Sequence, residues 1–334
     1  MGRAARQDDA VHPRVPLVVG VLVVALFATA CGTGPRPRLA GPSGTTGSDT
    51  TSSDTGVTGL TDTGAAPADT GAAPSSPPPT TTTLPPAAPN GRRYPVLPAD
   101  PAALVDELVR VDAALRDPTT PVADLPDLGH THQMIIRLLA RHPEWDVEVF
   151  TLVPDALLDD LTDHISARRA FADLSSGVDT PTKIPAWEIV EPAPLDDLRA
   201  FYAEAEATTG IGWEYLAAIN LVETGMGRIV GLSTAGARGP MQFIPSTWEE
   251  VGEGDIDDPH DAIVAAARYL VRRGGPDDMA AALWGYNNHD SYVEGVERYA
   301  SILRRDPLSL VALYNWEIHF FATAGDLWLP VGTR

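Results

Sequence analysis

Apolar residues recur every three or four positions through much of the chain beyond residue 97, a spacing that predicts α-helices. We expect a helical block over 98–176 from this pattern. Its first helix is indicated by the apolar positions Leu104, Leu108, Val111 and Leu115. Residues 177–194 contain four prolines and are expected to form an extended connector to the next part of the chain.

A second set of helices is predicted over 195–305. Gly210 and Gly225 follow apolar periodic stretches and should end helices there, whereas Asp258 precedes a proline and should begin one. The segment Ser246–Glu249 has the pattern of a capping box that opens a short helix.

The last part of the chain, 306–334, changes its pattern. Apolar residues alternate with polar ones on both sides of a glycine-containing turn. This pattern predicts a β-hairpin, which we expect to lie as a lid on the helical body.

The helix predicted over Trp213–Thr224 carries an acidic residue near its end. Leu216, Ile219 and Glu223 share one face, so Glu223 continues an apolar stripe. Partial burial and the negative end of the helix dipole both disfavour a charged carboxylate there. A carboxylic acid that stays protonated near neutral pH can act as a general acid. Since an acidic residue at a helix end is more often solvated, the following motifs decide between the two interpretations.

Three segments in this region carry recognisable motifs. They are 213–220 (WEYLAAIN), Ser233–Trp248 (STAGARGPMQFIPSTW) and Ala282–Asn287 (ALWGYN). Together they resemble the lytic transglycosylases, enzymes with a lysozyme-like fold that cut bacterial peptidoglycan. The resemblance spans about 195–300, and the block at 98–176 resembles a domain that precedes the catalytic one in exported actinobacterial members. The implied fold class is mainly α: an α+β lysozyme-like catalytic domain, a preceding helical block and a C-terminal β-hairpin.

The resemblance also implies roles for individual side chains. Glu223 is implied to be the single catalytic acid and base. The residues implied to bind or line the substrate are Ser233, Met241, Gln242, Tyr286 and Asn287. Gln242 and Asn287 would hold sugar N-acetyl or hydroxyl groups, and Tyr286 would lie close to Glu223 and orient it or the sugar. Core packing of Tyr286 and a loop-capping role of Gln242 are the alternatives.

The sequence departs from the family pattern at three points. Thr224 follows the glutamate where serine is common, Pro240 replaces leucine before Met241, and the loop after Asn287 differs. Thr224 keeps the hydroxyl. The third departure affects the loop more than the chemistry.

The implied reaction needs one carboxylate, because the substrate supplies its own nucleophile. Glu223 would protonate the leaving glycosidic oxygen and then deprotonate the muramic acid 6-hydroxyl, which closes a 1,6-anhydro ring. Ordinary glycosidases instead use two carboxylates that flank the bond. A hydrolysing muramidase on the same fold and a catalytically silent wall-binding lipoprotein are the alternatives. No metal or cofactor is expected.

The first thirty residues have the layout of an export signal. Arginines precede an apolar run, Val15–Ala30, which is shorter than the ~20 residues of a membrane-spanning helix. The single cysteine, Cys31, follows directly and resembles the lipidated cysteine of a bacterial lipobox, with Ala28 where leucine is usual. A plain signal-peptidase site and a retained anchor are alternatives. All three interpretations place the rest of the chain outside the cytoplasm, and lipidation places it on the outer face of the cell membrane, facing the wall.

A linker is expected over 31–97. Glycine, proline, serine and threonine make up 40 of the 59 residues in 32–90, and every tryptophan and tyrosine lies at position 94 or later. Such a segment cannot bury enough apolar area to offset its ordering entropy, so the composition predicts disorder. The linker would let a lipid-anchored body reach peptidoglycan strands above the membrane.

Charge and ligand counts exclude other functions. A formal net charge of −21 argues against nucleic-acid binding, and one cysteine excludes an intramolecular disulfide. The acidic run Asp255–Asp261 fits a helix start better than a calcium loop. His130 and His132 lack a third metal ligand at helical spacing and are expected to be surface residues. We expect no oligomer.

The lone cysteine leads to a first prediction. We expect Cys31→Ala to release the protein from membranes or to stall its processing, because the thiol that would carry the lipid is gone. Fractionation of cells expressing each form measures this. A variant that sediments with membranes as the wild type does would identify the run from Val15 as the anchor instead.

Overall fold

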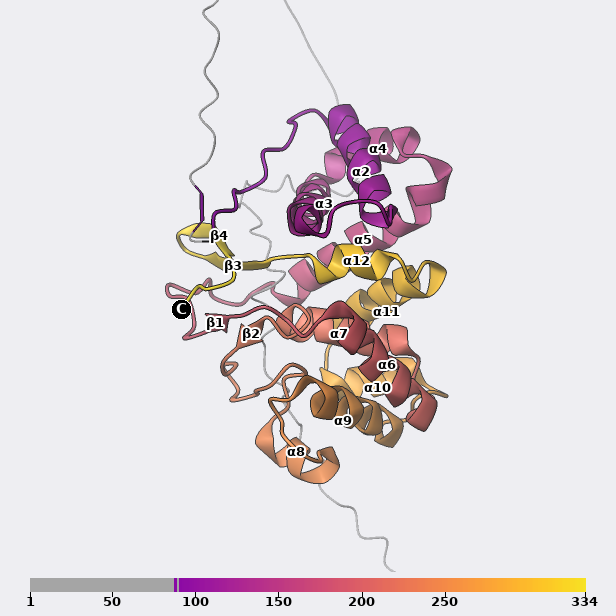
Figure 1. Cartoon of the computed structure of the whole chain (residues 1–334), viewed down its shortest axis with the longest axis vertical. Coiled ribbons are helices and arrows are strands. Elements are labelled where there is room, and N and C mark those ends of the chain that lie inside the picture. Colours follow the sequence, from indigo (N-terminus) through magenta and orange to yellow (C-terminus); the bar gives the residue numbers. More distant parts are fainter. Residues whose placement is uncertain (1–86, 89) are drawn as a thin grey trace, which may run out of the picture. The chain divides into compact units, whose positions relative to one another are not determined.

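The computed structural model describes residues 87, 88 and 90–334 (Figure 1). The expected signal peptide at 1–30, the lipidation residue Cys31 and most of the expected linker at 31–97 lie outside the described residues. The mainly helical fold class is confirmed, and the described residues also form two short antiparallel sheets.

The helical block begins where Asp100 caps its first helix. The Asp100 carboxylate accepts a hydrogen bond from the Ala103 backbone N–H at 3.0 Å, and Pro101 takes the first helical position, where no backbone donor is needed. The helices are α2 (Pro101–Arg116), α3 (Leu125–Arg141), α4 (Asp146–Leu152) and α5 (Asp155–Leu174), with 3₁₀ turns at Val122–Asp124 and Pro143–Trp145. Apolar side chains from all four helices form one buried cluster.

Glycine ends the two helices that lead to the predicted site, as expected. α6 (Leu195–Thr209) is followed by Gly210 and α7 (Trp213–Thr224) by Gly225, both in the left-handed conformation, with φ of 77° and 62°. The later helices are α8 (Pro245–Val251), α9 (Pro259–Arg272), α10 (Met279–Tyr286), α11 (Asp290–Arg305) and α12 (Ser309–Tyr314). α7 packs against α6, α9 and α11 and is therefore the central helix of this region.

Two predicted helix starts have different outcomes. The prediction of a capping box at Ser246–Glu249 is wrong. α8 begins at Pro245, and none of the described side chains caps it. Proline supplies a helical φ and needs no donor partner, so this start does not depend on the serine. The start of α9 is confirmed, because the Asp258 carboxylate accepts from the Asp261 backbone N–H at 3.1 Å.

The predicted hairpin is confirmed, with β3 (Ile318–Ala322) antiparallel to β4 (Gly325–Leu329). It is not a lid, because Ile318 and Phe320 are buried in the same core as α7. A second pair joins β1 (Glu188–Ile189) of the connector to β2 (Ile229–Val230) after α7. Strands of two residues carry too little alternation to be predicted from the sequence.

The helical block and the predicted catalytic region share a core. α5 packs along α11, and Ala167 and Phe171 of α5 belong to the same buried cluster as α7. Figure 1 shows α5, α11 and α12 stacked between the remaining helices of the two blocks. The boundary near residue 176 is thus a boundary in sequence only, and the two blocks form one packed body.

The surface positions expected for His130 and His132 are wrong. Both lie in the middle of α3 and are buried, with 0% and 3% of their surfaces exposed. His130 Nε2 lies 3.0 Å from His319 Nε2 of β3, and the Trp316 indole N–H donates to His132 Nδ1 at 3.2 Å. They face the hairpin segment rather than solvent because α3 is covered by it.

Ion pairs fasten the hairpin to α3. Asp326, near the hairpin turn, accepts hydrogen bonds from Arg137 and from Arg141, the latter at 2.8 Å. Arg137 is 2% exposed. Removing the partner of a buried charge costs about 3–5 kcal/mol, so the Asp326 contact fixes where the hairpin lies.

The expected linker ends before residue 97. Arg92 donates to Asp127 and to the Pro126 carbonyl, both at 2.7 Å, and also pairs with Glu317. The Tyr94 ring meets the His130 ring edge-on, with centroids 5.5 Å apart. Residues 92–94 are therefore part of the folded body.

The buried histidines lead to a prediction about stability. They are His130, His132, His164 and His319. Burial lowers the pKa of all four below 6.5, to about 4 for His132 and His319. As the pH falls, these histidines therefore bind protons in the unfolded chain at a higher pH than they do in the folded protein. The stabilisation is complete above pH 6.5, and the share from His132 and His319 is lost between pH 6.5 and 4.

We expect the free energy of unfolding to fall by on the order of 1 kcal/mol per histidine per pH unit below pH 6.5. Urea titrations across this range measure it. Equal stability at pH 7 and pH 5 would contradict the prediction.

Candidate active site

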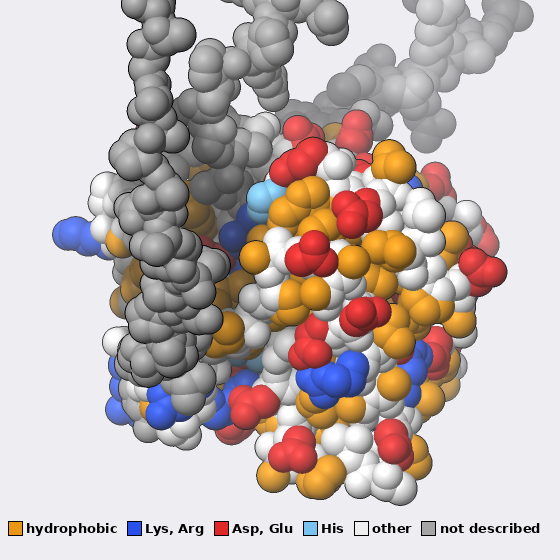
Figure 2. Space-filling view, turned by 90° about the horizontal axis from the view of Figure 1, so that it is seen from above, with side chains coloured by type: hydrophobic (Ala, Val, Ile, Leu, Met, Phe, Trp, Pro, Cys, Tyr) orange, Lys and Arg blue, Asp and Glu red, His pale blue; other side chains and the backbone are white. Residues whose placement is uncertain are grey.

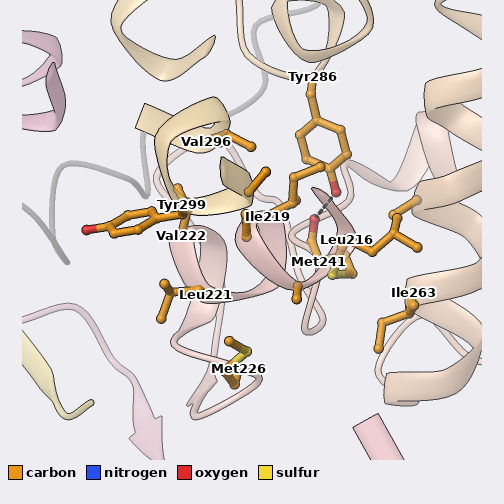
Figure 3. Packing of buried hydrophobic residues seen from close by; sticks show 14 of the residues in the cluster. Leu216, Ile219, Leu221, Val222, Met226, Met241, Ile263, Tyr286, Val296 and Tyr299 are labelled. Atoms are coloured by element: carbon orange, nitrogen blue, oxygen red, sulfur yellow. Dashed lines mark hydrogen bonds between the residues drawn. The ribbon is translucent and has the colours of Figure 1, made fainter. Parts of the chain in front are cut away.

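Glu223 is the last residue but one of α7 and is almost completely buried. The helix is apolar on all sides, and residues from Leu216 to Thr224 are buried without a gap. Figure 3 shows side chains of α7 packed against Ile263 of α9 and Val296 of α11. Only 1% of the Glu223 surface is exposed, which is deeper burial than the sequence alone predicts.

The carboxyl group of Glu223 has one hydrogen-bond partner. The Tyr292 hydroxyl of α11 donates to Glu223 Oε1 at 2.9 Å, and Oε2 has no partner among the described residues. Burial raises the pKa of Glu223 to about 8, and the hydrogen bond from Tyr292 opposes part of that rise. The predicted protonated acid is therefore favoured at neutral pH, through loss of water around the carboxylate.

Among the described residues, no second carboxylate contributes to the raised pKa of Glu223. Burial and the Tyr292 hydrogen bond account for its raised pKa, without a charged partner among the described residues. Glu249 and Glu250 lie on α8 and are exposed. Glu214, at the other end of α7, is paired with Arg304 at 2.8 Å.

Tyr286 contacts the site through a neighbour. Its hydroxyl donates to the Met241 carbonyl at 2.6 Å, drawn as a dashed line in Figure 3. Its ring lies parallel to the Tyr292 ring, with centroids 6.4 Å apart and planes 5° apart. Tyr286 thus holds the loop at Met241 and supports Tyr292, and the hydrogen bond to Glu223 comes from Tyr292.

The segment 233–243 forms a loop fastened to α7. The Pro240 carbonyl accepts from Thr224 Oγ1 at 2.6 Å and from Asn220 Nδ2 at 3.0 Å. The Thr224 hydroxyl therefore ties the loop to the residue beside Glu223. At the start of the loop, Ser233 Oγ accepts from the Ala237 backbone N–H at 3.0 Å.

Gln242 has a backbone conformation that is uncommon outside glycine. Its φ is +51°, and its Nε2 donates to the Gly239 carbonyl at 3.0 Å. Its Oε1 is buried without a partner among the described residues. Such strained positions cluster at functional sites, and a free buried acceptor is suited to a ligand donor.

Most of the predicted site residues lie close to the end of α7, but they differ in how deeply they are buried. Glu223, Met241, Gln242 and Tyr286 lie in or beside the buried cluster around the end of α7, and Gln242 and Tyr286 line one small pocket. Asn287, at the end of α10, is partly exposed. Tyr292 was missed because it lies outside the three motifs, although its spacing of seven from Tyr299 marks a buried helix face.

One group of potential metal ligands occurs in the described part of the chain. Ligand atoms of Asp258, His260 and Asp261 lie within 4.8 Å of one another. Asp258 and Asp261 already accept backbone N–H groups around the start of α9, and His260 lies 3.2 Å from Glu204. The arrangement is explained by helix capping.

On the face shown in Figure 2, acidic side chains are scattered among apolar ones. Among the described residues, every helix is too short or too polar to cross a membrane.

Comparison with known proteins places this geometry in context. Residues 201–306 match the family model for the Transglycosylase SLT domain. A curated relative, the membrane-bound lytic murein transglycosylase F of Thiobacillus denitrificans, is 33% identical over 126 residues. The match covers 35% of this chain and 27% of the relative, so the chain spans about a quarter of the relative's length. No solved structure matches significantly.

The protonation of Glu223 can be tested directly. We expect its carboxyl to be protonated at pH 7, and Tyr292→Phe to raise its pKa further, because the lost hydrogen bond favours the charged form. Difference infrared spectra over a pH titration measure this, with Glu223→Gln identifying the band.

Tyr202→Phe is the matched control, because that buried tyrosine donates to Asn220 rather than to Glu223. It should leave the Glu223 pKa unchanged. A carboxyl that titrates near pH 4.5 in the wild type would contradict the buried acid.

Proposed function

We propose, on the premise that residues 201–306 form an SLT transglycosylase domain, that the chain is a peptidoglycan lytic transglycosylase. It would cleave the β-1,4 bond between MurNAc and GlcNAc and leave a 1,6-anhydroMurNAc end. The observation that carries the proposal is the burial of Glu223, which raises its pKa to about 8 and so favours the protonated acid, with one oxygen hydrogen-bonded to Tyr292 and the other without a partner among the described residues.

The first half-reaction uses the proton of Glu223. Glu223 would donate it to the glycosidic oxygen as the bond from C1 of MurNAc to that oxygen breaks. The leaving GlcNAc then carries a hydroxyl, and the substrate's own acetamido group stabilises the positive charge at C1. A raised pKa supports this step, because most Glu223 is protonated at neutral pH.

The second half-reaction returns the proton. The Glu223 carboxylate would take the proton of the MurNAc 6-hydroxyl while O6 bonds to C1. The 1,6-anhydro ring closes, and Glu223 is protonated again. No water is consumed, and the acid returns to its starting state.

Gln242, Asn287, Ser233, Met241 and Tyr286 are proposed to bind the sugars or shape their cleft. Gln242 is the best supported, because its buried Oε1 lacks a partner among the described residues and suits a sugar N-acetyl N–H or hydroxyl. Tyr286 supports the site through Tyr292 and the Met241 carbonyl.

We further propose that the chain acts at the outer face of the cell membrane, anchored through Cys31. The name of the curated relative, a membrane-bound murein transglycosylase, supports a site near the membrane. The apolar run and cysteine of the N-terminal sequence support a lipid anchor.

A hydrolysing muramidase is the nearest alternative. It would use a second carboxylate about 5–9.5 Å from the first, whereas the side-chain partner of Glu223 among the described residues is the Tyr292 hydroxyl. Mass spectrometry of products from purified peptidoglycan distinguishes the two. Anhydro ends identify the transglycosylase, and reducing ends would identify a hydrolase.

Glu223→Gln tests the role of the acid. The amide occupies nearly the same volume but neither donates the proton nor accepts one back. We expect folding to be retained and cleavage to fall by about 10⁴-fold or more, because one residue serves both steps and each is worth about 10²–10⁴-fold. Wild-type activity should decline as the pH rises through about 8.

The melting temperature of Glu223→Gln serves as the control and should not fall, since the variant removes the cost of a buried ionisable group. Undiminished anhydro product from this variant would remove Glu223 from the mechanism. No product from the folded wild type would instead favour the silent wall-binding protein.

A further inference from the structure

The last turn of α5 reaches the catalytic acid from a part of the chain outside the SLT match. Phe171 of α5 is completely buried and belongs to the core cluster around α7. The family match begins only at residue 201. Phe171 is therefore contributed by the preceding helical block.

Phe171 contacts the tyrosine that holds Glu223. The Phe171 ring meets the Tyr292 ring edge-on, with centroids 6.5 Å apart and planes at 80°. It also stacks on Tyr299, about two helical turns further along α11, with centroids 6.0 Å apart. Since the Tyr292 hydroxyl donates to Glu223 Oε1, Phe171 lies one side chain away from the acid.

Gly295 makes this contact possible. Residues 292, 295 and 299 share one face of α11, and a Cβ at position 295 would collide with the Phe171 ring. The missing side chain opens a notch in α11 that the ring fills. The Phe171 ring therefore occupies the space that a side chain at position 295 would need.

Tyr292 is thereby supported on two sides. The Tyr286 ring lies parallel to it, and Phe171 meets it edge-on. A buried tyrosine has few rotatable bonds, so its hydroxyl position is set by the side chains packed around its ring. Without Phe171, the hydroxyl would be free to leave the 2.9 Å hydrogen bond with Glu223.

We propose that Phe171 is a positioning residue for the catalytic acid, acting through Tyr292. The helical block is then a working part of the active site and not a separate module. This inference rests on the proposed function, in which Glu223 transfers a proton and its orientation matters.

A double-mutant cycle tests the proposal. Phe171→Leu keeps an apolar side chain but loses the ring. We expect it to lower kcat on purified peptidoglycan by about three- to tenfold with little change in KM, because misorientation of a reacting group affects mainly the chemical step. In the Tyr292→Phe background, where no hydroxyl remains to be positioned, Phe171→Leu should change kcat by less than about twofold.

Ile165→Val is the matched control. Ile165 is a buried residue of the same helix, but it packs in the other core cluster. The variant should lower the melting temperature without changing kcat. An equal loss of kcat from Ile165→Val, or the same loss from Phe171→Leu in both backgrounds, would show a purely structural role and overturn the proposal.

Infrared titration gives a readout that does not need activity. If Phe171 holds the Tyr292 hydrogen bond, Phe171→Leu should raise the Glu223 pKa in the wild-type background and leave it unchanged with Tyr292→Phe. An unchanged pKa in both backgrounds would refute the proposal even if the wild type failed to cleave peptidoglycan. An inactive wild type with the expected pKa pattern would refute only the proposed function.

Discussion

The burial of one carboxyl group is the constraint on which the rest of the structure depends. Glu223 is 1% exposed, its nearest described partner is a neutral hydroxyl, and its pKa is raised to about 8. An unpaired carboxylate in such a place would be costly, so the group holds a proton instead. α7 can carry it only because apolar residues surround the helix on every side, supplied by α6, α9 and α11.

Three hydrogen bonds from buried side chains hold the 233–243 loop in place. Thr224 and Asn220 of α7 both donate to the Pro240 carbonyl, and Tyr286 donates to the next one, at Met241. These bonds hold Gln242 at a φ of +51°, which few residues other than glycine adopt. Strain of this kind persists only where the surroundings over-determine the backbone. Here they leave the Gln242 Oε1 buried without a partner among the described residues.

Features set by neighbouring residues could be predicted from the sequence, whereas contacts between distant segments could not. The ends of α6 and α7 could be predicted because Gly210 and Gly225 act on their own helices. The burial of Glu223 could be predicted because Glu223 continues the apolar stripe of its own helix. The side chains that contact one another from different helices and strands could not be predicted in this way. Tyr292 and His130 look like ordinary positions on amphipathic helices, and only the packing of α11 on α7 and of the hairpin on α3 gives them their contacts. The reach of α5 into the catalytic core follows from packing between segments far apart in sequence.

Two buried sets of ionisable groups give this body opposite responses to pH. The histidines between α3, α5 and β3 have lowered pKa values, so they favour the folded state more as the pH rises towards 6.5. Glu223 has a raised pKa, so its contribution is complete below about 4.5 and is lost as the pH rises through about 8. Each slope is on the order of 1 kcal/mol per pH unit for one group. Several histidines outweigh one glutamate below pH 6.5, and Glu223 dominates above it. At neutral pH the histidines therefore contribute their full stabilisation, while Glu223 has already lost part of its own.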